Sequence, residues 1–262
     1  MAHAFDQPVT RYMASELEIG ALDTPIDALA RAMQGRRISA IPIVDESNAL
    51  VGVVSRTDLI HLGVQNRATR TTSSAMALPR RRARDVMTPT PQTVPVSATV
   101  RAAATAMVER GIHRVFATRG PRLAGVVSCV DIAAVVRDAE VDLELSAIMT
   151  SPIVSIEASA PLGHAVEVLE RLHVTGLVVT DGVRPIGVFT QLDALACRDL
   201  PRNTPIDTVH DAAVVCLPAT TKLYRAADHV VQPDVQRVIV CKDREAIGIV
   251  TGLDFARYVA RN

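Results

Sequence analysis

A hydroxyl residue followed three positions later by an aspartate occurs four times in this chain, each time after a glycine and two apolar residues. The four copies, GVVSRTD, GVVSCVD, GVFTQLD and GIVTGLD, occupy residues 52–58, 125–131, 187–193 and 248–254. Their hydroxyl and carboxyl groups come from Ser55 and Asp58, Ser128 and Asp131, Thr190 and Asp193, and Thr251 and Asp254. This spacing suits two kinds of chemistry: closing the first turn of a helix, and holding a polar ligand at that turn.

In the structural interpretation, each Ser or Thr caps a helix N-terminus and the Asp completes a capping box, which stabilises the helix by about 1 kcal/mol. In the ligand interpretation, the free N–H groups of the helix and the hydroxyl bind a phosphate, and the carboxylate accepts the hydroxyls of a ribose. Capping boxes favour Glu or Gln at the third position. This chain uses Asp all four times, which favours a ligand, although the caps alone could account for the pattern.

The elements around the four corners recur with them. Thirteen or fourteen residues before each glycine a short β-branched run begins, at Ile38, Ile112, Val174 and Val235, and turn-forming residues separate it from the corner, which predicts a β-hairpin. Apolar residues at helical spacing precede each hairpin, at 24–34, 98–111, 160–172 and 220–231. Met13, Met87, Met149 and His210 mark the start of the four units. Each unit therefore reads lead-in, strand, helix, strand, strand, helix.

These features resemble the cystathionine-β-synthase-type (CBS) domain. The resemblance is carried by the lead-ins DVMTP and AIMTSP, by ISAIPIVD, and by the four corners in register. It implies an α/β fold of four β-α-β-β-α CBS repeats, paired into two pseudo-twofold modules, the first repeat with the second and the third with the fourth. The predicted division is repeat one at 1–62, a basic linker at 63–84, repeat two at 85–140, repeat three at 141–200 and repeat four at 201–262.

The resemblance implies that the corners bind adenosine nucleotides in clefts between paired repeats, with Asp on the ribose and the hydroxyl near phosphate. It also implies an adenine slot on the first strand of a repeat. By spacing, the slot residues are Thr93 and Val94 in the second repeat and Ser155 and Ile156 in the third. The first repeat has Ile19 and Gly20 there and the fourth has Cys216 and Leu217, so these two depart from the pattern.

Cationic residues that could neutralise phosphate stand in alternate repeats. Arg114 and Arg237 occupy equivalent positions in the second and fourth repeats, where the first and third have Ala40 and Gly176. The pair His113 and Arg114 resembles the phosphate-contacting pair of the gamma subunit of AMP-activated protein kinase, another four-repeat protein. The second repeat is therefore the best single candidate site.

Composition excludes several other classes of function. Lys and Arg number 28 and Asp and Glu also 28, and only 3% of residues are aromatic, so nucleic acid is not an expected partner. No apolar run is long enough for a membrane span and no secretory leader is recognisable, which predicts a cytoplasmic protein. The scattered cysteines and histidines show no metal-ligand spacing. The arginines at 63–84 predict a flexible, solvated linker.

The leading hypothesis is a non-catalytic sensor, without a cofactor, that binds AMP, ADP or ATP and signals to a regulated protein partner. Two alternatives stay open: a ligand-free interaction scaffold, and a CBS module that binds S-adenosylmethionine or a dinucleotide. The two modules either stack in one disc or form a homodimer through the same helical faces. No general base or nucleophile is placed for an enzyme.

Overall fold

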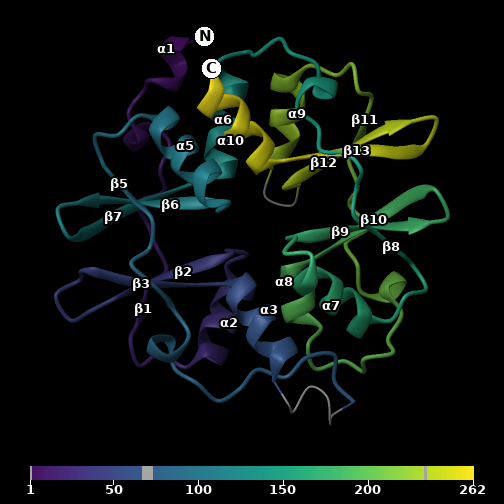
Figure 1. Cartoon of the computed structure of the whole chain (residues 1–262), viewed down its shortest axis with the longest axis horizontal. Coiled ribbons are helices and arrows are strands. Elements are labelled where there is room, and N and C mark those ends of the chain that lie inside the picture. The colour runs from purple at the N-terminus through teal and green to yellow at the C-terminus, as the bar shows by residue number, and fades with distance from the viewer. Residues whose placement is uncertain (1, 67–72, 233–234) are drawn as a thin grey trace. The chain divides into compact units, whose positions relative to one another are not determined.

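The computed structural model describes residues 2–66, 73–232 and 235–262. Four small sheets, each with its own helices, follow one another along the chain (Figure 1). The predicted α/β fold with four β-α-β-β-α repeats is confirmed.

Each repeat contains three strands and two helices in the predicted order. The first repeat comprises β1 (Gly20–Ala21), α2 (Ile26–Gly35), β2 (Ala40–Val44), β3 (Leu50–Ser55) and α3 (Arg56–Gln65). The second comprises β5 (Thr93–Pro95), α5 (Val100–Arg110), β6 (Arg114–Arg119), β7 (Arg122–Ser128) and α6 (Cys129–Asp138). The third comprises β8 (Ser155–Glu157), α7 (Leu162–Arg171), β9 (Gly176–Asp181), β10 (Arg184–Thr190) and α8 (Gln191–Ala196). The fourth comprises β11 (Cys216–Leu217), α9 (Leu223–Val230), β12 (Arg237–Lys242), β13 (Glu245–Thr251) and α10 (Gly252–Arg261).

Strand pairing is the same in every repeat. The first strand pairs parallel with the second, and the second pairs antiparallel with the third, as the hairpin prediction required. The hairpin register places the hydroxyl residue of each corner opposite the start of the middle strand: Ser55 opposite Ala40, Ser128 opposite Arg114, Thr190 opposite Gly176 and Thr251 opposite Arg237. The spacing-based alignment of the four repeats is therefore the structural alignment.

The lead-in segments carry short helices and one short strand. These are α1 (Ala2–Phe5), η1 (Val9–Arg11), η2 (Ala83–Asp85), β4 (Thr88–Pro89), η3 (Leu145–Ala147) and η4 (Ile206–Thr208).

Each lead-in docks on the neighbouring repeat rather than on its own. The N–H of Val9 in the first lead-in donates to Ala98 O at the start of α5 in the second repeat, at 2.8 Å. The second lead-in docks in turn on the first repeat, where the N–H of Ala83 donates to Thr24 O. The third and fourth lead-ins exchange in the same way. The chain thus couples the first repeat with the second and the third with the fourth.

This exchange explains the glycine that opens each corner. A Cβ atom on Gly125 would lie 2.8 Å from the backbone oxygen of Ala14 and 2.8 Å from the sulfur of Met13. Met87, Met149 and His210 approach Gly52, Gly248 and Gly187 in the same manner. The glycine is needed because the lead-in of the neighbouring repeat packs directly on it.

The chain divides into two compact units. Unit 1 contains residues 1–17, 92–153 and 213–262, and unit 2 contains residues 18–91 and 154–212. Unit 1 therefore holds the bodies of the second and fourth repeats, and unit 2 those of the first and third. Helix α10, yellow in Figure 1, packs against α5 and α6 in unit 1. Pairing of the first repeat with the second through facing sheets stays a prediction.

Buried residues of the middle and third strands supply the core of each unit. In unit 1, Val115, Val127, Val238 and Val250 are fully buried among the helices. In unit 2, Ile41, Val54, Leu177 and Phe189 are fully buried in the equivalent layer. Along β3, β7 and β13 alternate residues are buried, because the pleat turns successive side chains to opposite faces. The middle strands bury three to five consecutive residues.

The expected flexible linker is wrong for residues 73–84, although Arg67 and Arg70 lie outside the described residues. Met76 is fully buried in the core of unit 2 and fills the space beside Gly63. Its N–H donates to Arg198 O at 3.0 Å. Among the exposed arginines of this segment, Arg84 forms an ion pair of 2.7 Å with Asp23. The polar composition of the segment hid the anchor, because only Ala75, Met76 and Ala83 within 73–84 are buried.

Substitution of Gly125 tests the packing of the lead-ins. We expect Gly125→Ala to lower the free energy of unfolding by about 1–3 kcal/mol, because the added methyl group meets backbone as well as a side chain. Gly35→Ala is the matched control: nothing lies within 4 Å of the added atom and the position is in a helix, so the free energy should be unchanged or rise by about 0.5–1 kcal/mol. Urea unfolding measures both. Equal stability of the two variants would contradict this account.

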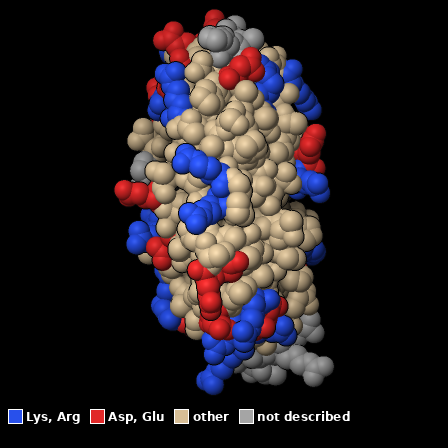
Figure 2. Space-filling view, turned by 90° about the vertical axis from the view of Figure 1, so that its left-hand side faces the viewer, with Lys and Arg blue, Asp and Glu red and all other residues tan. Residues whose placement is uncertain are grey.

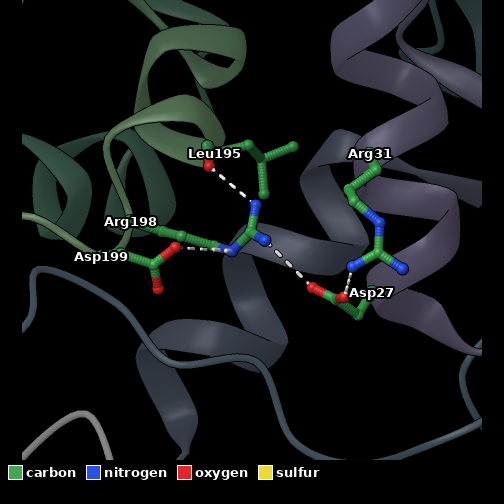
Figure 3. Close-up of polar contacts among 5 residues, drawn as sticks. All are labelled: Asp27, Arg31, Leu195, Arg198 and Asp199. Atoms are coloured by element: carbon green, nitrogen blue, oxygen red, sulfur yellow. Dashed lines mark hydrogen bonds and ion pairs between the residues drawn. The ribbon is translucent and has the colours of Figure 1, made fainter.

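In unit 2, one carboxylate joins the first repeat to the third. Asp27 on α2 accepts from Arg198, two residues beyond α8, with Oδ1 and Nη2 3.0 Å apart, and its other oxygen pairs with Arg31 on α2 (Figure 3). Arg198 also donates to Leu195 O at 3.1 Å. Its side chain is 14% exposed, whereas that of Arg31 is 63% exposed. The Arg198 contact should therefore contribute more to stability.

Matched variants of these two arginines test that ranking. We expect Arg198→Met to lower the free energy of unfolding by about 1–2 kcal/mol, because Leu195 O and Asp27 lose their charged donor. Arg31→Met removes an exposed pair to the same carboxylate and should cost about 0.5 kcal/mol or less. Chemical denaturation decides between them, and a larger loss for Arg31→Met would overturn the ranking.

Candidate nucleotide-binding site

All four corners form the capping box that the structural interpretation predicts. In the second repeat, Ser128 donates to Asp131 Oδ2 from both its N–H and its hydroxyl, each at 2.7 Å. The other corners repeat this geometry with Asp58, Asp193 and Asp254. One carboxylate oxygen of each Asp is thus used to start its own helix.

The second oxygen distinguishes the corners. Asp254 Oδ1 accepts from the Thr150 hydroxyl at 3.0 Å and from Arg257 Nη1 at 2.6 Å, and the side chain is almost fully buried. Within residues 2–66, 73–232 and 235–262, Oδ1 of Asp58 and of Asp131 accepts no hydrogen bond. These two aspartates retain an acceptor for a ligand hydroxyl. Asp254 could accept one only by losing its bond to Thr150 or to Arg257.

The sheet of the second repeat gathers its predicted site residues at one end. Thr93 begins β5, Arg114 begins β6, and Ser128 ends β7 directly opposite Arg114. Thr93 is exposed and Val94 beside it is buried. Asp131 follows in the first turn of α6. The structure therefore brings together the slot, cation, hydroxyl and carboxylate expected of this repeat.

In unit 1 this end of the second repeat meets the equivalent end of the fourth. A Cβ atom on Gly252, the first residue of α10, would lie 2.6 Å from Cβ of Cys129, the first residue of α6. The N-termini of two helices therefore converge. Thr251 precedes Gly252 and lies opposite Arg237, so Arg237 approaches this junction from the fourth repeat as Arg114 does from the second. Converging helix N-termini favour an anion.

Four charged side chains act on His113, and three of them are arginines. Burial, and after it the neighbouring charges of Arg114, Arg237 and Arg257, lower the pKa of His113 to about 4, whereas Asp254 opposes them. His113 is therefore neutral at neutral pH. Burial also lowers the pKa of Arg114, to about 10, which leaves this guanidinium charged. For Asp131, burial raises the pKa.

The junction in unit 2 has different chemistry. Gln191, the first residue of α8, exchanges hydrogen bonds of 3.2 and 3.3 Å with Thr57 on α3. Arg56, the first residue of α3, is buried and donates from Nε to Ile38 O at 3.0 Å. The predicted slot residues of the third repeat, Ser155 and Ile156, are exposed and buried respectively, as Thr93 and Val94 are.

Sequence reasoning missed the residues that form the two junctions. Arg56, Cys129, Gln191 and Gly252 all follow the capping hydroxyl directly, and Arg257 lies three residues after Asp254. The first four vary in type, so no repeated pattern marked them. A small residue at this position in both the second and fourth repeats was the available signal for close helix approach.

Surface charge agrees with the balanced composition. On the face shown in Figure 2, basic and acidic side chains are interspersed. Throughout the described ranges, no three His, Cys, Asp or Glu residues gather as metal ligands. In the same part of the chain, every helix is too short or too polar to cross a bilayer.

Comparison with known sequences identifies the family. The CBS domain profile matches residues 9–64, 83–138 and 145–199, more than half of the chain. The chain belongs to the CBS domain family. Its fourth repeat lies outside the matched stretches but has the same order of elements as the other three. The repeat boundaries given above stay a prediction.

Relatives and solved structures support the tandem CBS architecture. An uncharacterised 33.4 kDa protein in a ribosomal RNA operon of Thermofilum pendens is 27% identical over 194 residues, which cover 69% of this chain and 60% of that protein. A Methanocaldococcus jannaschii structure, described as a candidate archaeal homologue of the gamma subunit of AMP-activated protein kinase, superposes with a TM-score of 0.82 at 16% identity, over 96% of this chain and 99% of that one. An uncharacterised Pyrococcus horikoshii protein has a TM-score of 0.68 at 16% identity, over 97% and 100%. At these identities the two structures show the shared fold.

Titration of His113 tests the charge environment of the junction. The folded pKa of about 4 lies below the ordinary value of 6.5, so the unfolded chain binds more protons between these pH values. The free energy of unfolding should therefore fall as pH decreases from about 6.5 to about 4, by at most about 3 kcal/mol. Urea unfolding at several pH values measures this slope. His113→Gln should flatten it, and an equal slope in the variant would show that His113 is not held neutral.

Proposed function

We propose that the chain is a non-catalytic regulatory protein that binds an adenosine nucleotide, with the phosphate at the junction of α6 and α10 in unit 1. The observation that carries this proposal is the convergence of two helix N-termini with Arg114, Arg237 and Arg257. Helix N-termini and guanidinium groups that converge in this way attract an anion. Membership of the CBS family makes a nucleotide the expected source of that anion.

The second repeat supplies groups for the nucleoside. The free Oδ1 of Asp131 can accept a ribose hydroxyl without loss of the capping box, because Oδ2 alone forms the cap. Thr93 and Val94 offer a polar and an apolar contact for the adenine. In the fourth repeat the carboxylate of Asp254 is saturated, so that repeat contributes cations rather than a second ribose contact. We therefore expect one nucleotide in unit 1.

Occupancy would be signalled through the contact between the two repeats of unit 1. A phosphate that engages Arg114 and Arg237 holds the second and fourth repeats together at Cys129 and Gly252. A ligand changes the state of a protein only when it binds two conformations with different affinity. The conformation in which α6 and α10 approach closely is the one that nucleotide should favour, and a protein partner that distinguishes the two would receive the signal.

The ligand-free scaffold remains the competing function, and a specific observation favours it: every corner is a complete cap without any ligand. S-adenosylmethionine is the competing ligand. Its sulfonium group needs no cationic partner, so Arg114→Gln would spare its binding and weaken that of AMP or ATP.

Isothermal titration with AMP, ADP and ATP tests the proposed function. Asp131→Asn keeps an oxygen that can complete the cap but removes the charge that accepts ribose, so we expect nucleotide affinity to fall about tenfold or more. Asp58→Asn is the matched control, because Asp58 forms the same two 2.7 Å bonds in unit 2. Its effect on the unit 1 site should be small. Absence of heat with every nucleotide, after removal of copurified ligand, would support the scaffold.

A further inference from the structure

Two of the four cysteines of the chain lie together on the sheet of the fourth repeat. Cys216 begins β11 and pairs in parallel register with Ile239 of β12, and Cys241 lies two residues further along β12. Because side chains alternate between faces, Cys241 shares the face of Ile239. Cys216 is exposed and Cys241 is half-buried.

The positions of Cys216 and Cys241 have equivalents in the other three repeats. The equivalent residues are Thr93 and Thr118 in the second repeat, Ser155 and Thr180 in the third, and Ile19 and Val44 in the first. The two positions thus carry hydroxyl residues in the second and third repeats, aliphatic residues in the first repeat and thiols in the fourth. Cysteine makes up only 4 of 262 residues, so a matched pair of thiols at the slot position is unexpected without a shared role.

The spacing of the pair argues against a direct disulfide. Diagonal neighbours on adjacent strands have Cα atoms about 7–8 Å apart, whereas disulfide-bonded cysteines have Cα atoms about 4.4–6.8 Å apart. An ion bound between the two sulfurs replaces the single S–S bond with two metal–sulfur bonds. The longer link fits the larger Cα–Cα separation of the two cysteines. Zinc is a poor fit, since it takes four ligands and no cluster of three or more candidate ligands exists in the described part of the chain.

We propose that Cys216 and Cys241 form a two-thiolate site for a soft monovalent cation of the Cu(I) class. Soft thiolate ligands select Cu(I), and this ion is satisfied by two sulfurs in a linear arrangement. Binding forms two metal–sulfur bonds and releases the two thiol protons to solvent, without any change in oxidation state. This inference does not rest on nucleotide binding, which we place at Asp131 and the helix junction.

Cys241 makes the site pH-dependent. Burial, and after it the neighbouring Cys216 thiol, raise the pKa of Cys241 to about 12. The cation must therefore displace a proton that is firmly held at neutral pH. Affinity for the ion should increase with pH across the neutral range.

Competition for Cu(I) with a colorimetric chelator, on the reduced full chain without oxygen, tests the site. We expect one high-affinity Cu(I) per chain, and Cys216→Ser and Cys241→Ser should each weaken binding at least about 100-fold, because each removes a direct ligand. Cys197→Ser is the control: this half-buried thiol lies in unit 2 and its removal should leave the affinity unchanged. Circular dichroism confirms that each variant is folded.

Two outcomes would overturn the proposal. Undiminished binding in either single variant would show that the ion does not use both thiols. A complex of two chains around one ion, detected by native mass spectrometry, would show that each chain contributes one thiol and that the pair is not a site within one molecule.

Discussion

The hydrogen bonds between a Ser or Thr and the Asp three residues later fix where the closing helix of every repeat begins. Because the hydroxyl residue is also the last residue of a strand, the cap ties the helix N-terminus to one end of its sheet. The direction of the helix, the position of its free N–H groups and the location of the middle-strand arginine then follow from one corner. Without that constraint, the convergence of α6 and α10 would not occur at the ends of β6 and β12.

The same corner is used differently in the two units. In unit 1, Cys129 and Gly252 let two helix N-termini approach, and arginines from both repeats lie beside them. In unit 2, Arg56 occupies the helix start and Gln191 and Thr57 hydrogen-bond across the equivalent junction. The fold is a fourfold repeat, whereas the chemistry is that of two unlike pairs. We therefore interpret unit 1 as the part that meets a charged ligand, and unit 2 as the part whose junction is already filled by its own polar side chains.

Periodicity predicted the architecture well because each repeat must bury the same strand and helix faces. The strands, the helices, the capping role of Ser55, Ser128, Thr190 and Thr251, and the alignment of Arg114 with Arg237 all followed from spacing. Three features did not follow. The exchange of lead-ins depends on contacts between repeats, the anchoring of residues 73–84 depends on a few small or isolated apolar side chains such as Met76, and the saturation of Asp254 depends on Thr150 from a distant segment as well as on Arg257 of its own helix. Local patterns carry no information about such long-range partners.

The phosphate site that we propose at the junction of α6 and α10 can be observed directly. A crystal structure of the protein grown with AMP or ATP tests it most directly. We expect electron density for a phosphate within hydrogen-bonding distance of Arg114 at the N-terminus of α6, with a ribose hydroxyl on the Oδ1 atom of Asp131. A nucleotide bound elsewhere, or a junction that stays free of ligand at saturating nucleotide, would contradict it.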